Sequence, residues 1–164
     1  MSQIIYSVCA PVFNEQECLP TLVDKIAPVM EALQRPWELL LTDDGSSDRS
    51  WDVILELKQR FPFIRGLKFD RNHGQTAAMA AAIRASRGEF IITLDADLQN
   101  DPQDIPRLIE SLGNHDAAIG WRHDRQDTLV RRLSSRFANW FRNLVTNDGV
   151  QDTGCSLKLF RAST

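Results

Sequence analysis

The chain has 164 residues, of which 43% are hydrophobic and 25% are charged, and these values are typical of one globular domain with a buried core. Its formal net charge of −3 at pH 7 excludes a generally basic nucleic-acid-binding protein. No segment approaches the roughly 18 consecutive apolar residues of a membrane span, and no signal peptide precedes the first expected strand. We therefore expect a soluble domain of the cytoplasm. Its cysteines lack metal-ligand spacing and are expected to be free thiols, at Cys9, Cys18 and Cys155.

Strand-like and helix-like segments alternate along the chain. Apolar runs predict strands, in chain order, at 4–10, 37–42, 64–69, 90–94 and 117–120. Helical periodicity predicts helices between them, at about 17–33, 49–60, 75–86 and from 102 onward. Candidate helix caps are Asn14, Ser47 or Asp48, and Asp101. This alternation predicts an α/β domain with a mostly parallel sheet and helices on both of its faces.

Polar segments follow the first, second and fourth expected strands, at 11–15, 43–48 and 95–99. In parallel α/β sheets, ligands bind beyond the carboxyl ends of the strands. We therefore expect these three segments to meet at one edge of the sheet, and that edge is the candidate site.

A pair of carboxylates, Asp95 and Asp97, follows the apolar run 91–94. Residues i and i+2 of a continuing strand share a face, so both side chains can reach one site. Two close carboxylates repel each other unless a cation lies between them, and a hard ion such as Mg²⁺ or Mn²⁺ suits oxygen ligands. The amide oxygen of Gln99, two residues further on, is a candidate third ligand. The pair therefore predicts a metal site.

Two other interpretations of this pair remain open. The acidic residues could form a turn before the helix at Pro102, although Asp101 already supplies that cap. Four apolar residues followed by D-x-D are also typical of haloacid-dehalogenase-type phosphatases, in which the first Asp is a nucleophile. The position after the fourth strand, and Gln99 where those enzymes have Thr or Val, argue against a phosphatase.

The turn after the second strand contains more acid than a helix cap requires. Asp43 and Asp44 precede Gly45, which provides a permissive backbone. A carboxylate at this place can accept a hydrogen bond from a nucleobase N–H or a ribose hydroxyl. A plain turn with a cap explains Ser47 and Asp48 equally well, so we expect the ligand-binding role chiefly at Asp43.

The segment 121–142 carries six arginines against two aspartates. On a helix over 129–145, apolar side chains fall on one arc and arginines on the other. Such a helix could simply have one buried and one solvated face. A basic amphipathic helix with aromatic residues can also lie on an anionic membrane, and arginine binds phosphate with two hydrogen bonds.

Four segments in this order resemble glycosyltransferase family 2, whose members have the GT-A fold: 10–15 (APVFNE), 42–48 (TDDGSSD), 71–78 (RNHGQTAA) and 94–102 (LDADLQNDP). The sequence D-A-D-L-Q followed by a proline, and the later 152–158 (DTGCSLK), are most similar to the branch that makes polyprenyl-phosphate sugars, typified by dolichyl-phosphate mannosyltransferase. The resemblance implies one GT-A catalytic domain over 1–164, which ends earlier than the family's chains do.

The resemblance also implies roles for individual residues. The nucleotide-sugar would be bound by Pro11, Val12, Asn14, Glu15, Asp43, Asp44, Gly74, Gln75, Asp95 and Ala96. A Mg²⁺ or Mn²⁺ ion would be held by Asp95, Asp97 and Gln99. The acceptor phosphate would be bound by Arg122, Arg131, Arg132 and Arg136. Asp152 aligns with the residue proposed as a base, and Asp97 joins it as a catalytic residue.

The expected function is inverting transfer of a sugar from GDP-mannose or a UDP-sugar to polyprenyl or dolichyl phosphate. This places the protein peripherally at the cytoplasmic face of a membrane. One alternative is transfer to a sugar hydroxyl of a polysaccharide or glycolipid. The other is a nucleotide- and membrane-binding module without turnover.

Overall fold

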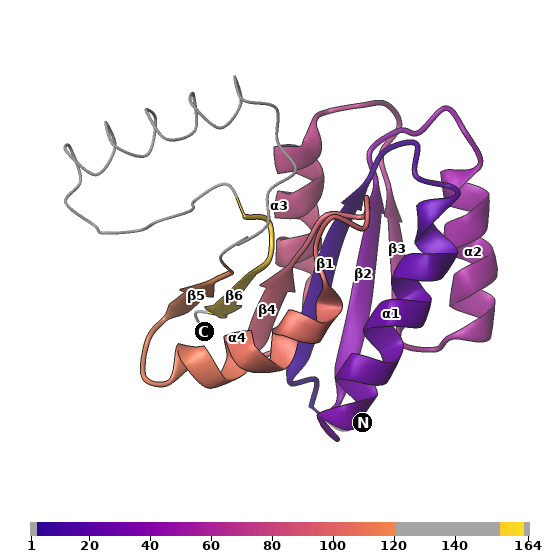
Figure 1. Ribbon diagram of the computed structural model, residues 1–164. Helices are drawn as coiled ribbons and strands as arrows, with labels where there is room; N and C mark the ends of the chain where they lie inside the picture. Colours follow the sequence, from indigo (N-terminus) through magenta and orange to yellow (C-terminus); the bar gives the residue numbers. More distant parts are fainter. Residues whose placement is uncertain (1–2, 121–154, 163–164) are drawn as a thin grey trace, which may run out of the picture.

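The computed structural model describes residues 3–120 and 155–162, and these residues form an α/β domain (Figure 1). The elements in chain order are β1 (Tyr6–Val12), α1 (Cys18–Ala32), β2 (Trp37–Asp43), α2 (Ser50–Arg60), β3 (Ile64–Lys68), α3 (Gln75–Ala85), β4 (Phe90–Thr93), the 3₁₀ helix η1 (Pro102–Asp104), α4 (Ile105–Leu112), β5 (Ala117–Ile119) and β6 (Lys158–Arg161). The described strands form one sheet in the order β3-β2-β1-β4-β6-β5.

Within the described residues the predicted strands and helices are confirmed, with boundaries that shift by a few residues; the helix considered over 129–145 lies outside them. The cap at Asp101 is confirmed too, because its carboxylate accepts a hydrogen bond from the Gln103 N–H at 3.0 Å. Asp48 likewise accepts from the Ser50 N–H at 2.9 Å, at the start of α2. The expected cap at Asn14 is wrong: Glu17 precedes α1 without a side-chain cap, and the side-chain oxygen Oδ1 of Asn14 accepts a hydrogen bond from the Ser47 N–H instead.

The sheet is parallel from β3 to β4, as predicted, and becomes antiparallel at β6. β6 was not expected from the sequence. It lies between β4 and β5 and is antiparallel to both. Its position separates two strands that are neighbours in the order of the chain, so a mixed sheet results.

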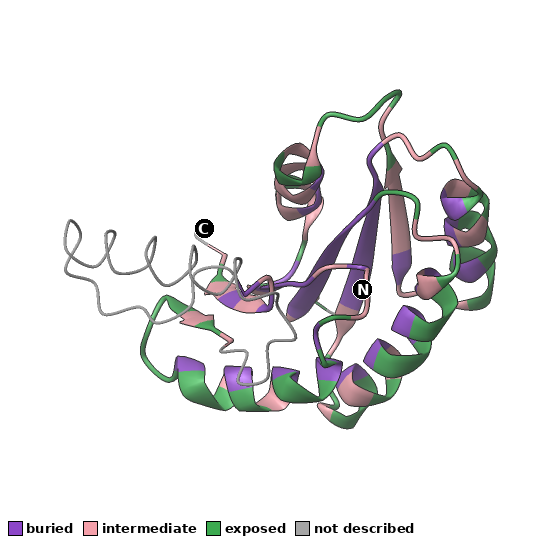
Figure 2. Ribbon diagram, turned by 45° about the horizontal axis from the view of Figure 1, so that its top comes forward, coloured by how far each residue is buried: buried purple, intermediate pink, exposed green. Residues whose placement is uncertain are grey.

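Helices cover both faces of the sheet, as predicted. On one face, α1, α2 and α4 pack against alternate residues of the central strands, such as Val8 and Leu39. On the other face α3 covers Cys9 and Leu40 through a small apolar cluster. Its alanines Ala78 and Ala82 are fully buried, since a methyl side chain lets the helix backbone approach the sheet. Figure 2 shows the buried residues concentrated on β1 and β2, between these two layers.

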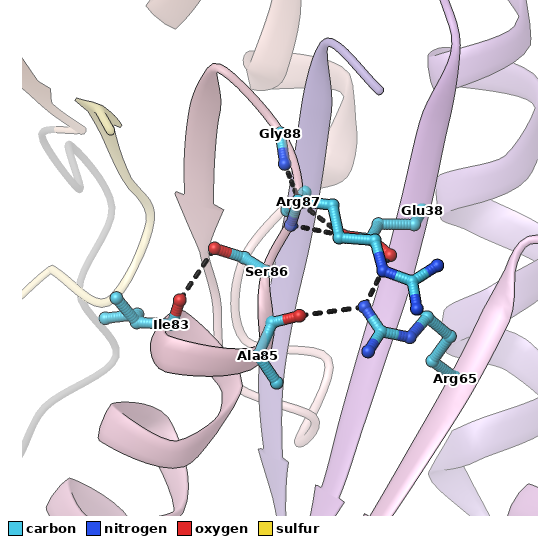
Figure 3. Close-up of polar contacts among 8 residues, drawn as sticks. Glu38, Arg65, Ile83, Ala85, Ser86, Arg87 and Gly88 are labelled. Carbon is cyan, nitrogen blue, oxygen red and sulfur yellow. Dashed lines mark hydrogen bonds and ion pairs between the residues drawn. The ribbon is translucent and has the colours of Figure 1, made fainter. Parts of the chain in front are cut away.

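A buried polar cluster fixes the carboxyl end of α3 to the amino ends of the strands (Figure 3). Glu38 accepts hydrogen bonds from the Ser7 hydroxyl at 2.7 Å, the Arg65 guanidinium at 2.8 Å and the Arg87 N–H at 2.8 Å. Arg65 also donates, at 2.8 Å, to the carbonyl oxygen of Ala85, the last residue of α3. This cluster lies at the edge of the sheet opposite to the candidate site, and it sets the position of α3.

Candidate functional site

The segments after β1, β2 and β4 meet at the carboxyl edge of the sheet, as predicted. There they border a cavity of about 340 Å³ together with residues from the segment before α3 and from α3 itself. The residues that line it are Pro11, Val12, Phe13, Glu15, Asp44, Asn72, Gln75, Asp95, Ala96 and Asp97. Eight of these ten are among the predicted nucleotide-binding or metal-binding residues, and the eighth, Asp97, was expected at the metal and as a catalytic residue. Phe13 and Asn72 were missed.

Both carboxylates of the predicted metal pair face this cavity, although not for the expected reason. β4 ends at Thr93, so Asp95 and Asp97 lie in the turn that follows and not on a continuing strand. Leu98 has a φ of 62° and reverses the chain there. Ala96, between the two carboxylates, is buried and anchors the turn in the core.

Gln99 lies apart from the cavity. Its side chain is exposed and is not among the lining residues, and its N–H donates to Asp97 Oδ1 at 3.0 Å. The described residues contain no group of three or more His, Cys, Asp or Glu side chains that could hold a metal by themselves. Mg²⁺ and Mn²⁺ sites commonly use one or two carboxylates and leave other positions to water and phosphate. Two half-exposed carboxylates on one cavity fit such an ion.

Gln75, the first residue of α3, contacts the pair directly. Its amide Nε2 donates to Asp95 Oδ1 at 2.5 Å. Gly74 before it has a φ of 93°, a backbone conformation that favours glycine. The sequence predicted that both residues bind the donor. Gln75 lines the cavity. Gly74 does not line it, and its N–H donates a hydrogen bond to Asp44.

Asp43, the last residue of β2, and Asp44, which follows it, have different surroundings. Asp44 lines the cavity, but its oxygens accept hydrogen bonds from the backbone N–H groups of His73 at 2.8 Å and Gly74 at 2.9 Å. Asp44 therefore fixes the segment before α3. Asp43 is fully buried and does not line the cavity. One of its oxygens accepts from the Ser46 N–H at 3.2 Å, and Oδ2 is buried without a hydrogen bond.

Glycine is required at position 45. Gly45 has a φ of 68°, and a Cβ there would overlap the backbone of Arg71 and Asn72. The turn after β2 and the segment before α3 therefore touch through their backbones. This contact places Asn72 beside the loop after β1, on the wall of the cavity.

Asn14 joins two loops and does not line the cavity. Its side-chain oxygen Oδ1 accepts hydrogen bonds from the Ser47 N–H at 2.8 Å and the Ser47 hydroxyl at 3.2 Å. Glu15 does line the cavity, and its N–H donates to the Ser50 hydroxyl at 2.8 Å. The serines after β2 thus position the loop after β1, a role that the sequence pattern alone did not reveal.

The segment before β6 is bonded to the turn after β4. The amide nitrogen of Asn100 donates to the Ser156 hydroxyl at 2.6 Å, and the Thr93 hydroxyl donates to the Ser156 carbonyl at 2.8 Å. Asn100 is buried, with 7% of its surface exposed. Sequence reasoning missed this junction, because its two sides lie more than fifty residues apart.

Several predicted residues lie outside the described residues: Arg122, Arg131, Arg132, Arg136 and Asp152. Their roles stay predictions. Among the helices that the structure describes, none combines the length and apolar composition needed to cross a bilayer.

Comparisons with known proteins agree with this geometry. The family model for glycosyl transferase family 2 matches residues 7–163. The chain is 41% identical over 161 residues to a dodecaprenyl-phosphate galacturonate synthase of Rhizobium johnstonii, covering 96% of this chain and 48% of that protein. It is 40% identical over 157 residues to an undecaprenyl-phosphate 4-deoxy-4-formamido-L-arabinose transferase of Pectobacterium carotovorum, covering 94% and 48%. The chain thus spans about half the length of these relatives.

Solved structures show the same fold at low sequence identity. A mannosyltransferase of Pyrobaculum calidifontis in complex with GDP-Man and Mn²⁺ matches with a TM-score of 0.69 and 17% identity, covering 98% of this chain and 45% of that one. Glucosyl-3-phosphoglycerate synthase of Mycobacterium tuberculosis, with Mn²⁺, UDP-Glc and phosphoglyceric acid, matches with a TM-score of 0.74 and 16% identity, covering 96% and 56%. The chain has the GT-A fold and belongs to glycosyl transferase family 2, in the branch whose named relatives are polyprenyl-phosphate sugar transferases.

Proposed function

We propose that this chain is the catalytic GT-A domain of a metal-dependent glycosyltransferase that moves a sugar from a nucleotide-sugar to a polyprenyl phosphate. The observation that carries the proposal is the cavity of about 340 Å³ at the carboxyl edge, which Asp95 and Asp97 border together with the loop after β1. The named relatives, which act on dodecaprenyl or undecaprenyl phosphate, support the choice of acceptor.

The nucleoside half of the donor fits the part of the cavity beside β1. Phe13 lines it and is 47% exposed, so its ring is free to stack on a nucleobase. Glu15 is the carboxylate in this part that can accept from ribose hydroxyls or base N–H groups. Asp43 does not line the cavity, but its Oδ2 atom is a buried acceptor with no hydrogen bond among the described residues, and such an acceptor is costly unless a donor reaches it.

The diphosphate of the donor fits the part beside Asp95 and Asp97. We propose that these two carboxylates hold Mg²⁺ or Mn²⁺, with the phosphates completing the coordination. The bound ion supplies charge neutralisation for the leaving diphosphate. The presence of Mn²⁺ in structures with this fold supports the choice of ion. Gln75 holds Asp95 in one orientation through the hydrogen bond to Oδ1.

The acceptor needs positioning more than activation. A phosphate oxygen is already anionic at neutral pH, whereas a sugar hydroxyl would need a general base to remove its proton. Attack on the anomeric carbon from the side opposite to the leaving diphosphate inverts its configuration. We propose that Arg122, Arg131, Arg132 and Arg136 bind the acceptor phosphate, and that Asp152 is a catalytic residue that acts either as a base or by orienting the acceptor. We propose that the reaction takes place at the cytoplasmic surface of a membrane, because a polyprenyl phosphate acceptor resides in the bilayer.

The donor-binding part can be tested by calorimetric titration of GDP and UDP, each with and without Mn²⁺. We expect one nucleotide to bind more tightly when Mn²⁺ is present. Binding of neither would contradict the proposed donor site. Incubation with the matching labelled nucleotide-sugar and undecaprenyl phosphate then tests transfer, and label found only in a polysaccharide or glycolipid acceptor would favour the hydroxyl-acceptor function instead.

A further inference from the structure

A second cavity, of about 350 Å³, adjoins the first and shares Gln75 and Asp95 with it. It lies on the α3 face of the sheet, between α3 and the strands β4 and β6. The residues that line it are Gln75, Thr76, Met79, Ala80, Ile83, Thr93, Asp95, Ser156, Lys158 and Phe160. Nothing described so far uses this space.

The register of β6 explains which side chains reach it. Lys158 pairs with Thr93, and Phe160 pairs with Ile91, in the antiparallel ladder between β4 and β6. Residues that face each other across such a ladder point to the same side of the sheet. Ile91 belongs to the cluster under α3, so Lys158 and Phe160 also project on that side. Leu159 projects to the opposite side, into the main core.

The cavity has an apolar wall and a polar part, which consists of Gln75, Thr76, Thr93, Asp95, Ser156 and Lys158; Lys158 is the cationic side chain among these lining residues, and Asp95 lies where the two cavities adjoin. None of the ion pairs within residues 3–120 and 155–162 involves Lys158, a half-buried residue that lines this cavity. Opposite it, α3 presents Met79, Ala80 and Ile83. A half-buried lysine that forms no ion pair with the described residues attracts an anion, and the apolar wall favours a hydrocarbon.

These features fit an isoprenyl phosphate better than a sugar. A hexose carries hydroxyl groups around its ring and needs hydrogen-bond partners on all sides, which the side chains of Met79, Ile83 and Phe160 do not offer. A phosphate joined to a branched hydrocarbon matches both parts of the cavity. A volume of about 350 Å³ holds the phosphate and the first isoprene units, while the rest of a long chain extends beyond it.

We propose that this second cavity binds the phosphate end of the polyprenyl phosphate acceptor, with Lys158 contacting the phosphate and Met79, Ile83 and Phe160 contacting the first isoprene units. The inference rests on the proposed function, since it names where the acceptor of that reaction binds. Because Asp95 and Gln75 border both cavities, a donor in the first and an acceptor in the second meet beside Asp95.

Farnesyl phosphate, a short isoprenyl phosphate, is a direct probe of this site in calorimetric titrations without donor or metal. We expect Lys158→Gln to weaken its binding by about 10- to 100-fold, because a charge-assisted contact is lost. Met79→Gln keeps the length of the side chain and the helix, and should weaken binding by about fivefold. The matched control is Lys58→Gln, an exposed lysine on α2, which should leave the dissociation constant unchanged.

A third substitution tests the charge without removing Lys158. Thr76 is exposed in the first turn of α3, where a carboxylate is compatible with the helix dipole, so Thr76→Asp should fold. It should weaken farnesyl phosphate binding by about tenfold through repulsion, whereas the neutral Thr76→Asn should not. Circular dichroism and thermal unfolding of each variant verify that the fold is kept.

Two further probes separate the parts of the ligand. Inorganic phosphate and farnesol should each bind more weakly than farnesyl phosphate. If inorganic phosphate binds as tightly as farnesyl phosphate, the cavity is only an anion site. If farnesol binds as tightly as farnesyl phosphate, the cavity is only an apolar site. Either result overturns the proposal. The proposal is also overturned if Lys158→Gln leaves the dissociation constant of farnesyl phosphate unchanged, or if the wild-type chain does not bind farnesyl phosphate.

The nucleotide titrations on the same samples distinguish this failure from failure of the proposed function. If GDP or UDP binds with Mn²⁺ and farnesyl phosphate does not, the second cavity is not the acceptor site and the donor site stands. If farnesyl phosphate binds with the expected pattern among the variants and no nucleotide binds, the lipid-phosphate site stands and the proposed transfer reaction fails.

Discussion

The side-chain amide of Gln75 donates a 2.5 Å hydrogen bond to Asp95 Oδ1, and this contact joins the first residue of α3 to the turn after β4. Both residues border both cavities. The position of α3 is set at its other end by the buried cluster of Glu38 and Arg65. The orientation of a predicted metal ligand therefore depends on how a helix is fixed to the sheet.

Removing this contact should weaken the metal site. In Gln75→Leu the side chain keeps its bulk and loses its donor, so Asp95 is free to rotate. Loss of a partner that orients a metal ligand typically reduces metal affinity or activity by about 10- to 100-fold. Titration of Mn²⁺ in the presence of the preferred nucleotide measures this. Gln59→Leu, at an exposed position on α2, is the control, and equal affinity in both variants would exclude the orienting role.

Substitution of Asp95 or Asp97 should reduce the affinity for Mn²⁺ more than substitution of Gln75 does. Asp95→Asn and Asp97→Asn each remove a charge with little change in shape. Each should reduce the affinity for Mn²⁺ by more than about 100-fold, which is the upper end of the effect of losing a partner that orients a ligand. Asp116→Asn, an exposed aspartate before β5, should leave it unchanged. Full Mn²⁺-dependent nucleotide binding in either site variant would show that the pair does not hold the metal.

Asn100 should affect stability and activity together, because it joins the turn after β4 to the segment before β6. Asn100→Leu is close in volume and leaves the Ser156 hydroxyl without its donor. A buried hydrogen-bonding group that loses its partner costs about 1–3 kcal/mol of unfolding free energy. Urea unfolding measures this cost. Simultaneous replacement with Ser156→Ala should cost less than the sum of the two single changes, and strict additivity would mean that the residues act independently.

The buried Glu38 should contribute far more to stability than exposed ion pairs do. Glu38 has 3% of its surface exposed and carries three hydrogen bonds, so Glu38→Gln leaves the half-buried Arg65 without its counter-charge. Such a change costs about 3–5 kcal/mol. Glu56→Gln breaks the pair with Arg49, whose side chains are 71% and 65% exposed, and should cost less than about 1 kcal/mol. Chemical denaturation that gives equal costs would contradict this difference.

Alkaline pH should destabilise the fold through Cys9. Burial, with a smaller contribution from the charge of Glu38, raises the pKa of its thiol from the ordinary value of 9.0 to about 12. Below pH 9 the thiol is protonated in both states. Between pH 9 and 12 it ionises only in the unfolded chain, so stability falls as pH rises, by up to about 1.4 kcal/mol per pH unit.

Unfolding free energies measured across this range should therefore show a shallower decline in Cys9→Ala than in the wild type. An identical slope in the two proteins would mean that Cys9 does not titrate as expected. Alkylation provides an independent check. Iodoacetamide should modify the half-exposed Cys18 in the folded protein before it modifies Cys9, which should react only after unfolding.

The sequence by itself determined the architecture of the first part of the chain. Apolar runs and helical periods placed four parallel strands and their helices, because local patterning reflects which face of each element is buried. The topology of parallel sheets then predicted that the segments after β1, β2 and β4 would meet, and they do. The pair Asp95 and Asp97 was found in this way, without any knowledge of distances.

Only the tertiary structure decided which of these polar residues face the cavity. Asn14 does not line the cavity, because its side-chain oxygen accepts hydrogen bonds from Ser47, 33 residues away. Asp44 lines the cavity, but its oxygens accept hydrogen bonds from the backbone of His73 and Gly74, 29 and 30 residues away. The position of β6 between β4 and β5 is equally non-local, and with it the second cavity and Lys158. Pairings between distant segments leave no periodic signal in a single sequence, because they are selected by the packing of the whole sheet.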